Sequence, residues 1–167
     1  MIRSIITTVI LCTVAVILQS TLIPKIAFFK VIPDIALCIL IFSAYVNGTM
    51  TGQVSGFFSG LLCDFISVSP IGLNCLVRTL IGAFAGVFKG MLFLDFFFMP
   101  VILCAIGTIL KAAIFFVLHL IMGPAVPAYS FTSSLLWIEI GLNALSAPLL
   151  FLLLKHFKLI HVGRGVT

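Results

Sequence analysis

Four ionisable side chains lie within long apolar stretches of the sequence: Asp64, Arg78, Lys111 and Glu139. If these stretches cross a membrane, each such side chain costs about 2.5 to 3.5 kcal/mol on insertion scales and is usually paired or functional. We expect Asp64 to pair with Arg78, and Lys111 to pair with Glu139. For the first pair, a role in stability alone and a shared role in docking a partner both stay open.

The sequence contains no arrangement of residues that predicts chemistry on a substrate. It has no H-E-x-x-H or G-x-S-x-G motif, no phosphate-binding loop, and no pair of acidic residues at one helical spacing. The five cysteines form no C-x-x-C pair and lie in or beside apolar runs, where free cysteine acts as a small hydrophobe. We therefore expect no enzyme, no metal site and no cofactor.

The composition is that of an integral membrane protein. Hydrophobic residues make up 63% of the chain and charged residues 8%, whereas a soluble domain carries about 25% charged residues. Crossing a bilayer takes about 20 mostly apolar residues per helix. The apolar runs predict one all-α membrane domain, residues 1–167, with about six spans near residues 4–23, 33–47, 50–67, 71–89, 96–122 and 132–154.

The second predicted span, residues 33–47, is too short to cross an apolar core of about 30 Å upright, so its full crossing stays open. Pro33 and Asp34 open this span. Proline suits the first turn of a helix, and an aspartate there can cap free backbone N–H groups. Capping alone explains both residues.

The basic residues of the short loops predict the orientation, because positive residues resist translocation. With a cytoplasmic N-terminus, only Lys25 and Lys30 lie outside, and their stretch is either an interfacial segment or an ordinary loop. Five basic residues then lie inside: Arg3, Lys89, Lys155, Lys158 and Arg164. We therefore expect both termini in the cytoplasm.

Two glycine stripes form the strongest pattern in the chain. Small residues at i+4 spacing let helix backbones approach closely, and the short connection from Ser67 to Gly72 predicts an antiparallel hairpin of the third and fourth spans. The stripes are Gly52, Gly56 and Gly60, followed by Gly82, Gly86 and Gly90. In one register of this hairpin, Gly60 faces Gly82, Gly56 faces Gly86, Gly52 faces Gly90 and Asp64 faces Arg78.

Polar residues gather in the outer half of the predicted bundle. Lys111 and Glu139 both lie there, counted from the turn between the last two spans. Asn74 and Asn143 add polarity, which indicates a polar chamber or groove. His119 lies near the same turn, where we expect it to be structural.

The segment from Gly56 to Gly86 resembles MreD, a bacterial rod shape-determining membrane protein family. The length, the six apolar spans and the short basic tail also agree with that family, so the resemblance covers essentially the whole chain. The residues that carry it are Pro33 and Asp34, the glycine-spaced span that ends in Asp64, the turn with Pro70, Gly72 and Asn74, and the following Gly82 and Gly86.

The resemblance implies a non-enzymatic subunit of the cell-elongation machinery in the bacterial inner membrane. It implies MreC as the main partner, with MreB, RodA and the transpeptidase partner of RodA as neighbours in peptidoglycan synthesis. We expect contact with membrane lipid and none with nucleic acid. The architecture is also similar to the substrate-binding subunits of energy-coupling-factor vitamin transporters, so a transport subunit is the alternative function; a membrane-embedded enzyme comes third.

Overall fold

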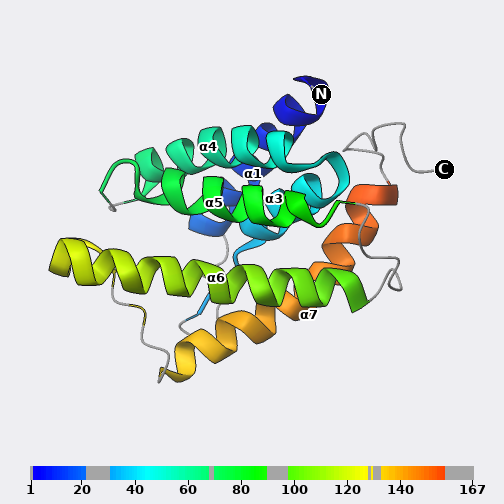
Figure 1. The fold of residues 1–167 in the computed structure, drawn as a ribbon. Coiled ribbons are helices and arrows are strands. Elements are labelled where there is room, and N and C mark those ends of the chain that lie inside the picture. The colour runs from blue at the N-terminus through cyan, green and yellow to red at the C-terminus, as the bar shows by residue number, and fades with distance from the viewer. Residues whose placement is uncertain are drawn as a thin grey trace.

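The computed structural model describes residues 2–21, 31–67, 70–89, 98–127, 129 and 133–156. Within these ranges the chain forms six α-helices, one short 3-10 helix and no strand (Figure 1). The predicted all-α membrane fold is therefore confirmed. The helices are α1 (Ile2–Thr21), α3 (Ile35–Asn47), α4 (Thr49–Ile66), α5 (Leu73–Val87), α6 (Phe98–Met122), η1 (Gly123–Ala125) and α7 (Ser134–His156).

Three segments of the described residues are long and apolar enough to cross a membrane. They are Ile2–Thr21, Phe98–Ala125 and Ser134–Leu154, while α3 and α5 are shorter apolar helices. Each of the six predicted spans contains one α-helix, with ends that differ by about two residues from the predicted ones. The number of helices that cross the membrane stays a prediction.

Helix α3 is the central helix of the bundle, with contacts to α1, α4, α5, α6 and α7. Leu37, Leu40, Ile41 and Ala44 are at most 1% exposed. A helix that is apolar all round belongs in a core. Its 13 residues span about 20 Å, which is less than the thickness of a bilayer core. Because five other helices surround α3, little of it faces lipid.

Helices α4 and α5 form an antiparallel hairpin in which the backbones nearly touch (Figure 1). A methyl group added at Gly52 would clash with the carbonyl of Gly82, and one added at Gly56 would clash with the carbonyl of Arg78. Small residues are thus required along this contact, as in other closely packed membrane helices.

The register of this hairpin differs from the predicted one by about two helical turns. Gly52 faces Gly82 instead of Gly90, which lies outside the described residues. The carboxylate of Asp64 binds backbone N–H groups at the start of α5, so it lies level with Gly72. Because of this contact, every facing pair differs from the predicted one. Gly56 lies against Arg78, Gly60 against Cys75 and Gly86 against Thr49.

A single residue, Gly48, joins α3 to α4. Its φ of 98° lies in the left-handed region, which glycine adopts without a steric cost. The side chain of Lys89 packs against Gly48, and its amino group donates to the carbonyl oxygen of Asn47 at 3.1 Å. Lys89 therefore caps the C-terminal end of α3.

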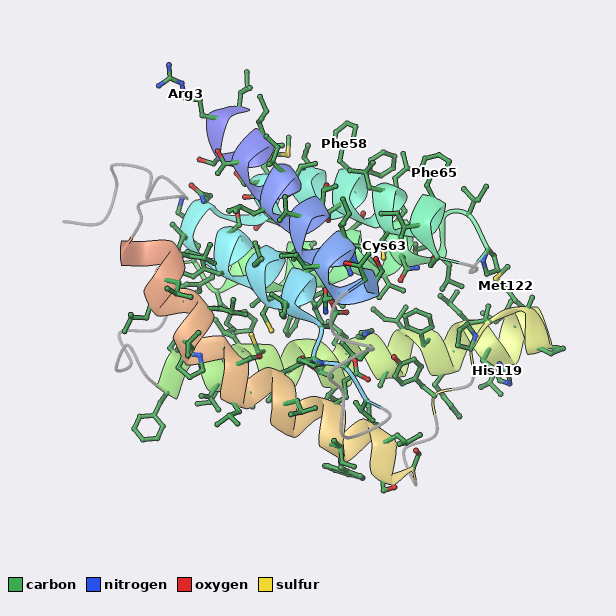
Figure 2. The ribbon with its side chains drawn as sticks, turned by 180° about the vertical axis from the view of Figure 1, so that it is seen from behind. Arg3, Phe58, Cys63, Phe65, His119 and Met122 are labelled. Atoms are coloured by element: carbon green, nitrogen blue, oxygen red, sulfur yellow. The ribbon has the colours of Figure 1, made fainter. Side chains whose placement is uncertain are left out.

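The outer surface of the bundle is apolar. Phe58 and Phe65 on α4 point away from the bundle in Figure 2, and they are 49% and 67% exposed. Ile6 and Ile10 on α1 are 54% and 56% exposed. Because lipid tails are as apolar as these side chains, this surface suits the interior of a bilayer.

Candidate functional site

Four charged side chains from four parts of the bundle form one chain of ion pairs, which we call the ionic cluster: Arg78, Asp34, Lys111 and Glu139. Asp34 precedes α3 and lies at the centre. Its Oδ1 is 3.3 Å from Nη2 of Arg78 on α5, and its Oδ2 is 2.9 Å from Nζ of Lys111 on α6. Lys111 Nζ also lies 2.8 Å from Oε1 of Glu139 on α7.

The ionic cluster is largely removed from solvent and has no net formal charge. Its side chains are 6% to 14% exposed. Breaking a buried ion pair by removing one partner costs about 3 to 5 kcal/mol, because the other charge is left unpaired. The cluster therefore holds α5, α6 and α7 to the beginning of α3.

Asp34 is fixed by further hydrogen bonds. Its Oδ1 accepts from the backbone N–H of Leu37 at 3.0 Å, which caps α3, and its own N–H donates to Oδ1 of Asn143 at 2.6 Å. The amide of Asn143 in turn donates to Oγ1 of Thr108 at 2.9 Å. Capping was predicted for Asp34, but it does not explain the residue alone, because both cations of the cluster also bind it.

Tyr129, in the connection between α6 and α7, extends the cluster. Its hydroxyl donates to Oε2 of Glu139 at 3.4 Å, and its ring centroid is 5.9 Å from Nζ of Lys111. Burial raises the pKa of the Tyr129 phenol above its ordinary value. The hydroxyl therefore stays protonated and keeps its role as a donor.

A cavity of about 580 Å³ lies beside the ionic cluster. It is lined by all four charged side chains and by Tyr129, together with residues at the end of α1, the end of α4 and the start of α7. Asn74, Asn143 and His119 do not line it. His119 instead makes a local contact, with Nδ1 2.7 Å from the carbonyl oxygen of Val126.

Asp64 does not bind Arg78, so the predicted pairing of these residues is wrong. The carboxylate of Asp64 accepts hydrogen bonds from the backbone N–H groups of Gly72 and Asn74 at 2.9 Å and of Cys75 at 3.1 Å, and from the Asn74 side chain at 2.9 Å. The first N–H groups of a helix have no partner within it, and its N-terminus favours negative charge. Since Gly72 has no side chain to cap α5, Asp64 does so from α4.

The remaining predicted site residues have local structural contacts. The carbonyl oxygen of Pro33 accepts from the side chain of Gln19 and from the N–H of Ile35, which ties the end of α1 to the start of α3. The carbonyl oxygen of Pro70 accepts from the N–H of Leu73 at 3.2 Å. Gly72 has a φ of 97° at the start of α5. Pro33 and Pro70 therefore shape the connections that position Asp34 and Asp64.

Asp34 was predicted only as a helix cap, and its place in the ionic cluster was missed. The chain has four acidic residues, and once Asp64 is assigned to the start of α5, Arg78 needs another partner. Asp34 precedes the first residue of its helix, and the predicted orientation puts it in the same outer half as Lys111. Its position was therefore a signal, although no local pattern distinguishes a helix cap from an ion pair.

Comparison with known families decides where this chain belongs. The family model described as rod shape-determining protein MreD matches residues 2–157. The chain belongs to the MreD family. The predicted resemblance to MreD is thus confirmed, and this MreD protein is a membrane protein of rod-shape determination.

Neither the curated proteins nor the solved structures contain a match to this MreD protein. The predicted similarity to the transporter subunits therefore stays a prediction.

Proposed function

We propose that this MreD protein is a non-enzymatic membrane subunit of the bacterial cell-elongation machinery that docks MreC and helps to organise peptidoglycan synthesis. The family match over residues 2–157 carries this proposal. MreB, RodA and the transpeptidase partner of RodA are its neighbours in the same assembly. The protein works in the inner membrane with both termini in the cytoplasm.

The geometry of the ionic cluster supports a scaffold more than a catalyst. A general acid or base must be within hydrogen-bond reach of the proton that it transfers and must be free to exchange it. Here Lys111 is held between the carboxylates of Asp34 and Glu139, and Asp34 also caps a helix. These contacts fix the positions of the helices. We therefore assign the cluster a structural role in the bundle and not a catalytic one.

The glycine contact supports docking through a rigid hairpin. The small residues of α4 and α5 are used inside the hairpin, so they are not free to receive a partner helix. The outward side of α4 instead presents large apolar side chains, among them Phe58 and Phe65 (Figure 2). In this proposal the ionic cluster sets the helix positions, and MreC recognises the resulting outer surface.

A clean deletion of the gene tests the proposal. Cells without this protein should be rounded and widened, and the wild-type gene should restore the rod. A gene with Lys89→Gln should also restore it, because Lys89 is exposed and makes one hydrogen bond to a carbonyl. Normal rods in the deletion strain would contradict the proposed function.

A further inference from the structure

One nitrogen of the ionic cluster lacks a partner. Nη1 of Arg78 is buried and makes no hydrogen bond within the described part of the chain. The other terminal nitrogen, Nη2, reaches Asp34 at 3.3 Å and the sulfur of Cys63 at 3.8 Å. Lys111, by contrast, has two carboxylate contacts of 2.8 and 2.9 Å. Arg78 is therefore the cation of the cluster with unused capacity for an anion.

An unpaired donor of this kind is costly. Leaving a buried polar group without a partner costs about 1 to 3 kcal/mol, and more for a charged group. Arg78 is 5% exposed, so bulk water does not supply the missing acceptor. Other atoms of Arg78 line the cavity, so a rotation of the guanidinium would bring Nη1 within reach of an acceptor on a ligand there.

The cavity has the size and the mixed lining of a site for an amphiphile. Its volume of about 580 Å³ falls within the range of about 300 to 1,000 Å³ for small-molecule sites. Next to the charged side chains, the wall includes Val16, Ile66, Leu135 and Leu136. A polar end and an apolar end are therefore available to one ligand.

The cavity reaches the apolar outer surface of the bundle. Ile66 and Leu135 line it, and they are 45% and 51% exposed. Gln19 and Ser20, near the end of α1, also line it, and Lys111 lies near the middle of α6, so the cavity extends from the helix ends towards the middle of the bundle. Polar headgroups of a bilayer lie at the level of helix ends, with the chains directed towards its centre. An acyl chain can therefore leave the cavity into lipid.

We propose that this cavity binds one membrane lipid through an oxyanion of its headgroup, which accepts from Nη1 of Arg78. A guanidinium fits phosphate through parallel N–H donors, which a point charge does not provide. The apolar chain of the lipid lies along Ile66 and Leu135. This site does not depend on MreC, so it goes beyond the proposed function.

Lipid binding to the purified full-length protein tests this site, with native mass spectrometry as the readout. Three probes separate the contributions: dioleoylphosphatidylglycerol, dioleoylglycerol with the same chains but no phosphate, and inorganic phosphate without chains. We expect one phosphatidylglycerol to bind about tenfold or more tightly than dioleoylglycerol, the factor that corresponds to one charge-assisted hydrogen bond. Inorganic phosphate should bind weakly.

Variants connect the binding to the cavity. Arg78→Gln should weaken phosphatidylglycerol binding about tenfold or more, and Arg78→Lys should restore part of it. Ile66→Trp should also weaken binding, because it fills the cavity without changing a charge. Phe65→Trp is the matched control, since Phe65 neighbours Ile66 but points away from the bundle (Figure 2). The helical content of each variant must equal that of the wild type.

Equal binding of phosphatidylglycerol and dioleoylglycerol would overturn the proposal, as would equal binding by the wild type and folded Arg78→Gln and Ile66→Trp variants. If inorganic phosphate binds as tightly as the lipid and requires Arg78, the oxyanion site is real but its ligand is free phosphate, and the lipid proposal is wrong. Recovery of MreC with the same preparations reports separately on the proposed function.

Discussion

The ammonium group of Lys111 lies 2.9 Å from a carboxylate oxygen of Asp34, 77 residues earlier in the chain. This contact attaches the beginning of the central helix to the middle of the longest helix. Lys111 also binds Glu139, so one ammonium group connects three parts of the bundle. The position of this lysine makes it the branch point of the ionic cluster.

Lys111→Met should destabilise the protein more than Glu139→Gln. The first change leaves the carboxylate of Glu139 without its cation and removes one of the two cations of Asp34, whereas the second leaves Lys111 paired with Asp34. We expect a loss of about 3 to 5 kcal/mol for Lys111→Met and a smaller loss for Glu139→Gln. Thermal loss of helical signal in detergent measures both.

The double variant is the control for this order. With Lys111→Met already present, adding Glu139→Gln removes an unpaired charge, so the double variant should be no less stable than Lys111→Met alone. Equal stability of the two single variants would mean that Lys111 is not shared as the structure shows.

Exchanging the charges of Asp64 and Arg78 should harm the protein. The carboxylate of Asp64 caps α5 and that of Asp34 binds Arg78, so Asp64→Arg with Arg78→Asp removes the cap and places two acids together. We expect less folded protein than with Asp64→Asn alone, as measured by size-exclusion chromatography of a fluorescent fusion. If the exchange instead recovered the amount of folded protein, Asp64 and Arg78 would pair directly, which would contradict the structure.

Substitution of Gly52 by alanine should separate the α4 and α5 hairpin, because the new methyl group would clash with the backbone of Gly82. Such overpacking typically costs about 1 to 3 kcal/mol. Gly141→Ala is the matched control: this glycine is exposed on α7 and no atom lies within 4 Å of an added methyl group. The control should be neutral or up to about 1 kcal/mol more stable, through higher helix propensity.

Unfolding temperatures of the two alanine variants give the test. A Gly52→Ala protein as stable as Gly141→Ala would show that the hairpin backbones are further apart than described.

The orientation of the chain can be measured with two reporter fusions. A reporter active only outside the inner membrane should be inactive at Thr167 and active at Gly123, because an even number of crossings returns the C-terminus to the cytoplasm. The fusion at Gly123 controls for expression. Strong activity at Thr167 would place the C-terminus outside and refute the orientation.

The helices could be predicted from the sequence because each one lies in a mostly apolar run bounded by Pro, Gly or charged residues. The spacing of four residues places Gly52 and Gly56 on one face of α4. It does not give the register of the hairpin, which depends on where the connection turns. Here the carboxylate of Asp64 reaches the N–H of Gly72 and shifts that register.

The ionic cluster could be predicted only in part, because helical periodicity says which residues share a face but not which helix lies opposite. Lys111 and Glu139 lie on consecutive helices, so their proximity followed from the short connection between them. Asp34 precedes α3 and Arg78 lies on α5, so α4 lies between them in the chain. Their contact depends on how α3 packs in the whole bundle, which no local pattern encodes.

Recovery of MreC with the tagged wild-type protein from native membranes tests the proposed function most directly. MreC should elute with the wild type and with Lys89→Gln, and its yield should fall with Asp34→Asn, which leaves Arg78 and Lys111 without their shared carboxylate. Yields are compared at equal amounts of folded protein. If the wild type is abundant and folded but no MreC elutes with it, the docking function proposed for this MreD protein is contradicted.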